Sequence, residues 1–460
     1  MRRRRSLLIL LVAALVAACS PQRVFSPRLT SQVVETPTPA AVQVGAGLSA
    51  EQGLALISQA FVILLDQYVE PVDPVALLRA AWDGFAGALP AGQARPEPPV
   101  LTGTTPAADF ARFRRSYLEA ASLAGGAEMQ AHLAREAVRK MVTSLGDCHT
   151  SYVEPQQMQE QLARLRGNLQ FGGIGVRIKR RPNEPVIVWE LLEGGSAGKA
   201  GIRPGDAILK VDGRDTATSS LEQIAAAIRG PEGTQVRLTV ERADGRRVQD
   251  VTLKRVAISE PPFQGKLLRG NIGYLRLHSF STAGQSELLQ GVRSLETQGV
   301  KGWIIDLRTN GGGELPVFTS LLSKFLKDGP FGFQVDRRGQ RLALGPDGSY
   351  LPRQHPMVVL VGDSTSSAAE LFAAAIQHFR AGTVIGTKTA GCVGIATPFR
   401  LDDESGLYVS VSKLLGPGGE ELNKRGLTPD EVIEITRSDL AAGKDPQLER
   451  ALAILGAPAR

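Results

Sequence analysis

Two turns rich in glycine, serine and threonine each follow an apolar strand in the second half of the sequence, and both are suited to chemistry. In the first turn, Gly311, Gly312 and Gly313 come shortly after the apolar run 303–307. Successive glycines leave backbone N–H groups uncovered, and such groups can stabilise an oxyanion. The second turn, 361–370, reads Val-Gly-Asp-Ser-Thr-Ser-Ser-Ala-Ala-Glu and opens a helix, where a hydroxyl meets favourable backbone dipoles. Taken alone, a serine there is more simply explained as a helix cap.

The patterns around these turns predict the elements that must position them. Apolar strands alternate with helices through the second half of the chain, which favours an α/β layered domain. The first part is mostly helical, with later helical patterns at 107–141 and 154–165. The predicted regions are a helical N-terminal region at 49–166, a small β-domain at 168–258, an α/β core at 259–440 and a C-terminal helix at 441–460.

The β-domain opens with the glycine-rich sequence Phe-Gly-Gly-Ile-Gly-Val at 171–176 and resembles a PDZ domain. Consecutive backbone N–H groups beside glycine can bind the terminal carboxylate of a peptide, which then adds as a strand to the edge of the domain. The resemblance implies a carboxylate-binding loop made of Gly173, Ile174, Gly175 and Val176. The alternative is a β-domain that serves only as a spacer.

Five motifs follow one another in a fixed order between residues 49 and 434. They are the PDZ-like domain, Asp-Leu-Arg-Thr-Asn-Gly-Gly-Gly at 306–313, Ser-Ala-Ala-Glu at 367–370, Val-Ile-Gly-Thr-Lys-Thr at 384–389 and Gly-Leu-Thr-Pro-Asp at 426–430. Together they resemble the C-terminal processing (tail-specific) serine peptidases, relatives of the tricorn protease core. The resemblance implies a crotonase-like (ClpP/crotonase-type) layered α/β peptidase core with an inserted PDZ domain. It also implies that Ser367 is the nucleophile and that the N–H groups of Gly312 and Ala368 are the oxyanion donors.

The sequence departs from this family at the general base, for which the family uses a lysine. The family's spacing places that lysine at Cys392. A serine nucleophile needs some base near neutral pH. The tricorn-like branch takes its base from an earlier loop, which resembles Gly-Asp-Cys-His-Thr at 146–150. His149 is therefore the candidate base, with a structural role in hydrogen bonding as the alternative, and Lys388 is a weaker candidate.

An acid that orients His149 is also expected from the resemblance. The tricorn-like branch places a glutamate at a position that corresponds to Asn423 here, and Glu421 lies two residues away. Glu370, beside the nucleophile, is a second candidate, although an acidic residue in the first turn of a helix is usually explained by the helix dipole.

Two of the chain's three cysteines fall at this predicted site. Cys148 adjoins His149, and Cys392 stands at the lysine position. In the family fold both loops border the nucleophile, so in an oxidising compartment the two thiols can pair and fix the histidine loop beside Ser367. Two buried free thiols, or a reactive cysteine nucleophile, are the alternatives.

The amino terminus has the pattern of a bacterial lipoprotein signal. Four arginines precede an apolar run at 7–18, and Val-Ala-Ala then precedes Cys19. The run is shorter than the roughly 20 residues of a spanning helix and fits a secretory signal. We expect a signal peptide at 1–18, lipidation of Cys19 and a disordered tether at 19–48. The alternative is plain secretion with a coincidental cysteine.

The composition excludes several other classes of protein. The chain has 460 residues, 43% hydrophobic and 22% charged, which is ordinary for a soluble globular protein and excludes a multi-span membrane protein. The net charge is +7, but the basic residues form no stripe interleaved with aromatic residues, so no nucleic-acid partner is expected. Three cysteines exclude a disulfide scaffold. No His/Glu pair has metal-ligand spacing, so neither a metal nor an organic cofactor is implied.

The sequence therefore predicts an extracytoplasmic serine endopeptidase, lipid-anchored to a bacterial membrane, that captures polypeptide C-termini through its PDZ groove. The alternative is a catalytically inactive peptidase fold that has lost its lysine and binds peptide C-termini as an envelope scaffold. The oligomeric state is left open.

Overall fold

The computed structural model describes residues 47–457, apart from 94, 156–157, 159–170, 182, 246–247 and 352–354. The described residues belong to one unit, Val44–Arg460. The predicted signal peptide at 1–18, Cys19 and nearly all of the predicted tether at 19–48 lie outside the described residues, as does most of the helical pattern at 154–165. Within the described ranges, no helix is both long and apolar enough to cross a membrane.

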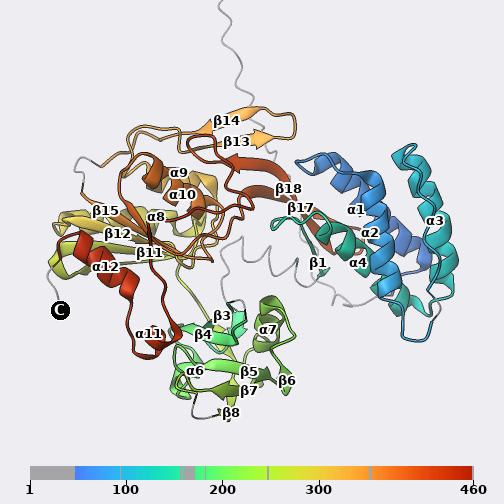
Figure 1. Ribbon diagram of the computed structural model, residues 1–460, viewed down its shortest axis with the longest axis horizontal. Helices are drawn as coiled ribbons and strands as arrows, with labels where there is room; N and C mark the ends of the chain where they lie inside the picture. Colours follow the sequence, from blue (N-terminus) through green and yellow to red (C-terminus); the bar gives the residue numbers. More distant parts are fainter. Residues whose placement is uncertain are drawn as a thin grey trace, which may run out of the picture. The chain divides into compact units, whose positions relative to one another are not determined.

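Where the structure describes the N-terminal region, four helices form it (Figure 1): α1 (Ala50–Gln67), α2 (Pro74–Gly87), α3 (Pro106–Ser122) and α4 (Ala127–Thr143). The first three begin after a side-chain cap, Ser49, Asp73 or Thr105, whose oxygen accepts a backbone N–H of the first turn. The pattern at 107–141, predicted as one helical stretch, is divided between α3 and α4. Gly125 lies between them with a φ of 116°, which no helical residue adopts.

An antiparallel sheet brings the helical region to the core. Its strands are β1 (Ser151–Val153), β13 (Gly332–Asp336), β14 (Arg341–Leu344), β17 (Gly394–Arg400) and β18 (Gly406–Leu415). β18 pairs with β1, β13 and β17, and it extends towards α1–α4 (Figure 1). Its Leu407 and Val409 are buried in one cluster with side chains of α1–α4. Since β1 begins directly after the loop 146–150, this pairing draws that loop towards the core.

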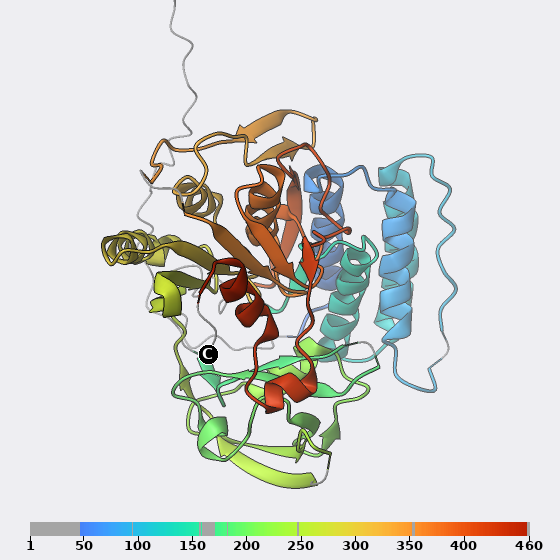
Figure 2. The same ribbon diagram turned by 60° about the vertical axis from the view of Figure 1, so that its left-hand side comes forward.

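The core sheet has the strand order β10 (Phe263–Leu268), β11 (Ile272–Leu277), β12 (Gly302–Asp306), β15 (Met357–Val361), β16 (Thr383–Gly386), β19 (Glu431–Val432). All neighbours are parallel except β10 with β11. Alternate side chains face opposite sides. One face packs on α8 (Gln285–Thr297), α9 (Leu315–Leu322) and α10 (Ala368–His378), and the other on α12 (Pro446–Ile454), in front of the sheet in Figure 2. The core is thus mixed α/β, with helices on both faces.

The β-domain has its own buried cluster and a five-strand path of β3 (Val176–Lys179), β4 (Val186–Leu191), β5 (Ala207–Val211), β7 (Gln235–Glu241) and β8 (Val248–Lys254). The short strand β6 (Arg214–Asp215) pairs with β5, and β2 (Phe171–Gly173) pairs with β9 (Val256–Ile258). Two helices, α6 (Ser196–Lys199) and α7 (Leu221–Ile228), complete the domain. Ion pairs join it to the core, including Lys179 Nζ to Asp363 Oδ1 at 2.7 Å.

A buried ion pair fixes the end of β12. Arg308 Nη2 lies 2.6 Å from Asp306 Oδ2, and the Tyr274 hydroxyl donates to the same oxygen at 2.7 Å. Arg308 also pairs with Asp445, the residue that caps α12, at 2.9 Å. Burial alone would raise the pKa of Asp306, but the charge and hydrogen bonds of Arg308 outweigh it and lower the pKa to about 2.

We expect the difference in unfolding free energy between the wild type and Asp306→Asn to shrink by about 1 kcal/mol between pH 5 and pH 3. The pKa falls on folding, so the ionised carboxylate stabilises the fold above the ordinary value of 3.8 and loses this contribution as the pH falls towards 2. Urea unfolding at the two pH values measures the difference. A difference that stays constant or widens would show that Asp306 is not the group that titrates.

Candidate active site

Ser367 lies directly before α10 and has a strained backbone. Its φ of 56° and ψ of −126° are a conformation that residues with a Cβ rarely adopt. Its N–H holds it there by donating to the Cys392 carbonyl oxygen at 2.8 Å and to Glu370 Oε2 at 3.2 Å. A partly buried serine in a strained turn between a strand and a helix is how several hydrolases present a nucleophile.

The two turns singled out in the sequence lie side by side because they follow the neighbouring parallel strands β12 and β15. The Thr365 hydroxyl donates to the Leu307 carbonyl at 2.7 Å, and the Ser366 N–H donates to the Asn310 carbonyl at 3.1 Å. Gly312 packs directly on Ser367. A Cβ at Gly312 would lie 2.6 Å from the Ser367 Cβ, and the φ of Gly312 is 98°, so only glycine fits at this position.

The two predicted oxyanion donors differ in whether their N–H group already has a hydrogen-bond acceptor in this structure. The Ala368 N–H, at the first position of α10, donates to no acceptor among the described residues, and Ala368 itself is fully buried. The Gly312 N–H is occupied, because it donates to the Asn310 Oδ1 at 2.8 Å. The Asn310 side chain, two residues earlier, therefore occupies the N–H group that is predicted to bind the oxyanion.

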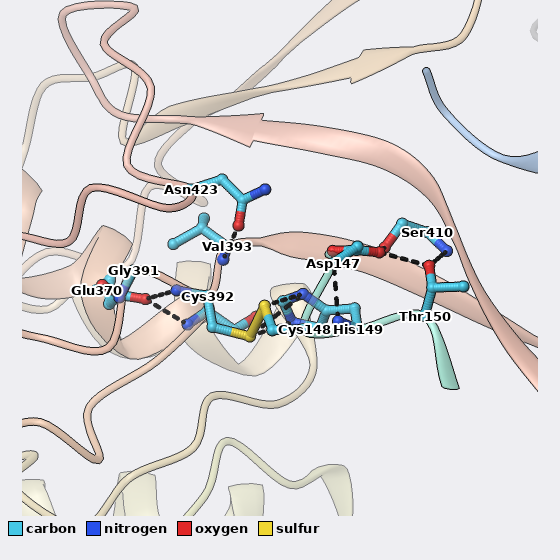
Figure 3. The surroundings of a disulfide bond; sticks show 11 residues. Asp147, Cys148, His149, Thr150, Glu370, Gly391, Cys392, Val393, Ser410 and Asn423 are labelled. Atoms are coloured by element: carbon cyan, nitrogen blue, oxygen red, sulfur yellow. Dashed lines mark hydrogen bonds between the residues drawn. A yellow bond between two sulfur atoms is a disulfide. The ribbon is translucent and has the colours of Figure 1, made fainter. Parts of the chain in front are cut away.

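His149 faces sulfur atoms in this structure (Figure 3). Its Nδ1 lies 3.3 Å from Cys148 Sγ and 3.5 Å from Cys392 Sγ. Burial lowers the pKa of His149, and the charge of Asp147 opposes that shift only in part, which favours the neutral imidazole that a general base requires. No hydrogen bond joins its ring to the Ser367 hydroxyl in the described part of the chain.

Cys148 and Cys392 are joined by a disulfide (Figure 3). The bond ties the loop before β1 to the loop before β17, and the Cys392 carbonyl oxygen accepts the Ser367 N–H. Cys392 thus contacts the candidate base through its sulfur and the backbone of the candidate nucleophile through its carbonyl oxygen. Lys388 is exposed, and it has no hydrogen bond or ion pair with either residue among those described.

In the described part of the chain, neither acid proposed for His149 forms a hydrogen bond or an ion pair with its ring. Glu370 is buried and accepts hydrogen bonds from Thr389 Oγ1, the Gly391 N–H at 2.9 Å and the Cys392 N–H at 3.0 Å, in addition to that of Ser367. Burial raises the pKa of Glu370, although all of these hydrogen bonds lower it. Glu421 is partly exposed, with Oε1 3.8 Å from Lys413 Nζ. Glu370 therefore organises the Cys392 loop, and Glu421 pairs with a surface lysine.

The acidic residue whose charge acts on His149 is Asp147, which was not among the acids predicted from the sequence. Its carboxylate accepts the His149 backbone N–H at 3.4 Å and the hydroxyls of Thr150 and Ser410 (Figure 3). It holds the loop in place and supplies the negative charge that acts on the imidazole. The feature of the sequence that could have identified Asp147 is its position two residues before His149 in a polar loop.

A groove of about 990 Å³ joins the glycine-rich loop of the β-domain to the turns of the core. It is lined by the predicted carboxylate-binding residues, Gly173, Ile174, Gly175 and Val176, and by α7. Arg308, Thr309 and Ser364 line it from the core. An extended peptide end can therefore lie between the β-domain and the strand ends that lead to Ser367.

Comparisons with known proteins agree with this arrangement. The profile of peptidase family S41 matches residues 271–433, and that of a PDZ domain matches 188–242. The chain is 33% identical over 326 residues to the carboxyl-terminal-processing protease of Synechocystis sp., covering 69% of this chain and 76% of that protein. It is 32% identical over 299 residues to the carboxy-terminal processing protease CtpA of Bacillus subtilis, covering 65% of this chain and 63% of that protein.

Among solved structures, the photosystem II D1 C-terminal processing protease is similar, with a TM-score of 0.59 and 26% sequence identity. The match covers 88% of this chain and 98% of that one, so it includes both the β-domain and the core.

Proposed function

The chain belongs to peptidase family S41, the carboxyl-terminal-processing proteases, and we propose that it is a serine endopeptidase that recognises polypeptides by their C-terminal tails. The observation that carries the proposal is the strained backbone of Ser367 at the start of α10, with Gly312 packed against its side chain. Such strain persists only where the surrounding structure enforces it, and it clusters at functional sites.

In the proposed reaction, Ser367 Oγ attacks the scissile carbonyl carbon while His149 accepts the hydroxyl proton. The negative charge on the tetrahedral intermediate faces the Ala368 N–H and the N-terminus of α10. The intermediate then expels the amine, which takes the proton from His149 and leaves an acyl group on Ser367. Water, deprotonated by the same imidazole, attacks the acyl carbon and releases the second product with the free serine.

For this reaction, two groups of the site have to move from their positions in the structure. The His149 ring has to turn from the sulfurs towards Ser367, and the Gly312 N–H has to exchange Asn310 Oδ1 for the oxyanion. In the proposal Cys392 stands where the family carries its lysine, so an imidazole takes the proton that an amine would otherwise take. We also assign the core to the crotonase-like layered class, which the helices on both faces of the core sheet support.

The substrate's C-terminal carboxylate would bind at residues 173–176, and the preceding residues would extend along the groove towards Ser364. The groove's lining by both the β-domain and the core supports this path. The basic residues before the apolar run 7–18, and the small residues before Cys19, support an extracytoplasmic protein that is lipid-anchored to a bacterial membrane.

One experiment on the full chain tests recognition and anchoring together. Membrane and soluble fractions of cells that make the wild type or Cys19→Ser are assayed on two unfolded peptides, identical except for a free or an amidated apolar C-terminus. We expect activity in the membrane fraction for the wild type and in the soluble fraction for Cys19→Ser. We expect amidation to lower kcat/KM about 10- to 100-fold, because charge-assisted hydrogen bonds to the carboxylate are lost.

Equal cleavage of the two peptides would contradict recognition of the tail. Wild-type activity in the soluble fraction would contradict the lipid anchor. Peptide binding without any cleavage would instead favour the inactive binding protein.

A further inference from the structure

Two sulfur atoms and an imidazole nitrogen that can bind a metal ion lie together beside Ser367. The Sγ atoms of Cys148 and Cys392 and a ring nitrogen of His149 all lie within 4.8 Å of one another (Figure 3). Sequence spacing does not predict the group, because 243 residues separate His149 from Cys392. The pairing of β1 and β17 with β18 brings the two loops together in the folded chain.

The distances within this group suit a tetrahedral metal centre. Zinc bound at about 2.3 Å to sulfur and about 2.0 Å to nitrogen holds these atoms about 3.5 Å apart, and holds two sulfurs about 3.8 Å apart. His149 Nδ1 already lies 3.3 and 3.5 Å from the two sulfurs. The sulfurs alone have to separate, which requires that their bond be broken. We propose that, after reduction of the disulfide, Cys148, His149 and Cys392 bind one zinc ion.

Zinc can bind at this site only after a reductant has opened the disulfide. A dithiol reductant gives two electrons and two protons to the Cys148–Cys392 disulfide, forming two thiols, and itself becomes a disulfide. Zinc then displaces one proton from each thiol, so binding releases two protons to solvent. Two thiolates and a neutral imidazole leave the bound group without net charge. Magnesium and calcium prefer oxygen ligands, so this donor set favours a thiophilic ion such as zinc over either of them.

The two loops are held by hydrogen bonds that do not involve the sulfurs. Glu370 accepts the N–H groups of Gly391 and Cys392, and Asp147 accepts the His149 N–H. These bonds persist when the disulfide opens, so the ligands stay close together. Cys148 is exposed, which gives both the reductant and the ion access. With three protein ligands, the fourth position is left to water.

The consequence for activity depends on the proposed function. A zinc ion on Nδ1 draws the His149 ring towards Cys148 and Cys392 and lowers the basicity of the imidazole. The ion would therefore inhibit cleavage by depriving Ser367 of its base. Zinc binding itself does not depend on catalysis, so it can be measured without an activity assay.

The test uses the full chain, reduced without air by a water-soluble phosphine. The phosphine becomes its oxide, with water supplying the oxygen and the two thiol protons. After removal of the phosphine, Zn²⁺ is titrated in competition with a chromophoric chelator, and Co²⁺ is used in parallel to detect sulfur-to-cobalt charge-transfer absorption. We expect one ion per reduced chain with that absorption, and neither in the oxidised chain.

Variants identify the ligands. Loss of an outer-shell partner alone costs about 10- to 100-fold in metal affinity, so Cys148→Ser, Cys392→Ser and His149→Gln should each lose more than about 100-fold. Cys19→Ser, at the third cysteine, and His378→Gln, at an exposed histidine, should bind as the wild type does. Circular dichroism confirms that each variant is folded, and His149→Gln keeps both cysteines, so its result does not depend on their loss.

A reduced wild type that binds zinc no more tightly than Cys392→Ser, or zinc binding that disappears in Cys19→Ser, would overturn the proposal. A chain that binds zinc when reduced, but cleaves nothing in its oxidised, zinc-free form, would refute only the proposed peptidase function. A chain that cleaves peptides but binds no zinc would refute only this site.

Discussion

Replacing Ser367 with alanine is expected to lower kcat/KM for an unfolded polypeptide by at least about 1,000-fold, because no acyl-enzyme can form. The change removes one oxygen from a side chain that is only partly buried, so the fold should persist. Initial rates of peptide cleavage, together with covalent labelling by a fluorophosphonate, measure the loss. Labelling should disappear with the hydroxyl, since the reagent forms its bond with the activated serine.

Two comparisons make this result specific. Ser122→Ala, at the exposed end of α3, should keep wild-type rates. His149→Gln should lose a comparable factor, and the double variant with Ser367→Ala should be no slower than either single one, because nucleophile and base act as a unit. Cleavage that survives Ser367→Ala would exclude this nucleophile, and full activity in His149→Gln would remove the imidazole from the reaction.

The parts of the fold that depend on local pattern could be predicted from the sequence. Alternating apolar strands and helices predict a mixed α/β core, because a parallel strand needs a crossover and helices bury both faces of the sheet. The neighbouring positions of the two glycine- and serine-containing turns rest on the order β12–β15 in the core sheet. Strand order is not encoded in periodicity, and only the family resemblance indicated that the turns meet.

The details of the site depend on single hydrogen bonds that residue types do not specify. Asn310 could equally have pointed into solvent, but its Oδ1 accepts the Gly312 N–H. Asp147 was not distinguished from other loop acids, since its role depends on Ser410 in β18, which is 263 residues away. Glu370 was recognisable as a residue of the first turn of a helix, but its bonds to the Cys392 loop exist only in the folded chain.

Replacing Glu370 with alanine should lower the unfolding free energy by about 3–5 kcal/mol, the largest effect on stability that we expect. The carboxylate accepts four hydrogen bonds in a fully buried position. The Ser367 N–H keeps the Cys392 carbonyl oxygen as its second acceptor, but each buried donor that is left without a partner costs about 1–3 kcal/mol. The missing side chain cannot be replaced by solvent without opening the packing around Ser367 and Cys392. Urea unfolding of the oxidised chain measures the loss.

Glu370→Gln separates the charge from the shape of the side chain. The amide keeps one acceptor oxygen but turns an N–H₂ group towards the N–H of Cys392 and of Ser367, so its stability should fall between those of the wild type and Glu370→Ala. Glu128→Ala, an exposed acid in the first turn of α4, should cost less than about 1 kcal/mol, because it removes only an interaction with the helix dipole. Equal costs for Glu370→Ala and Glu128→Ala would mean that the Cys392 loop keeps its conformation without the carboxylate, and that the disulfide alone fixes it beside Ser367.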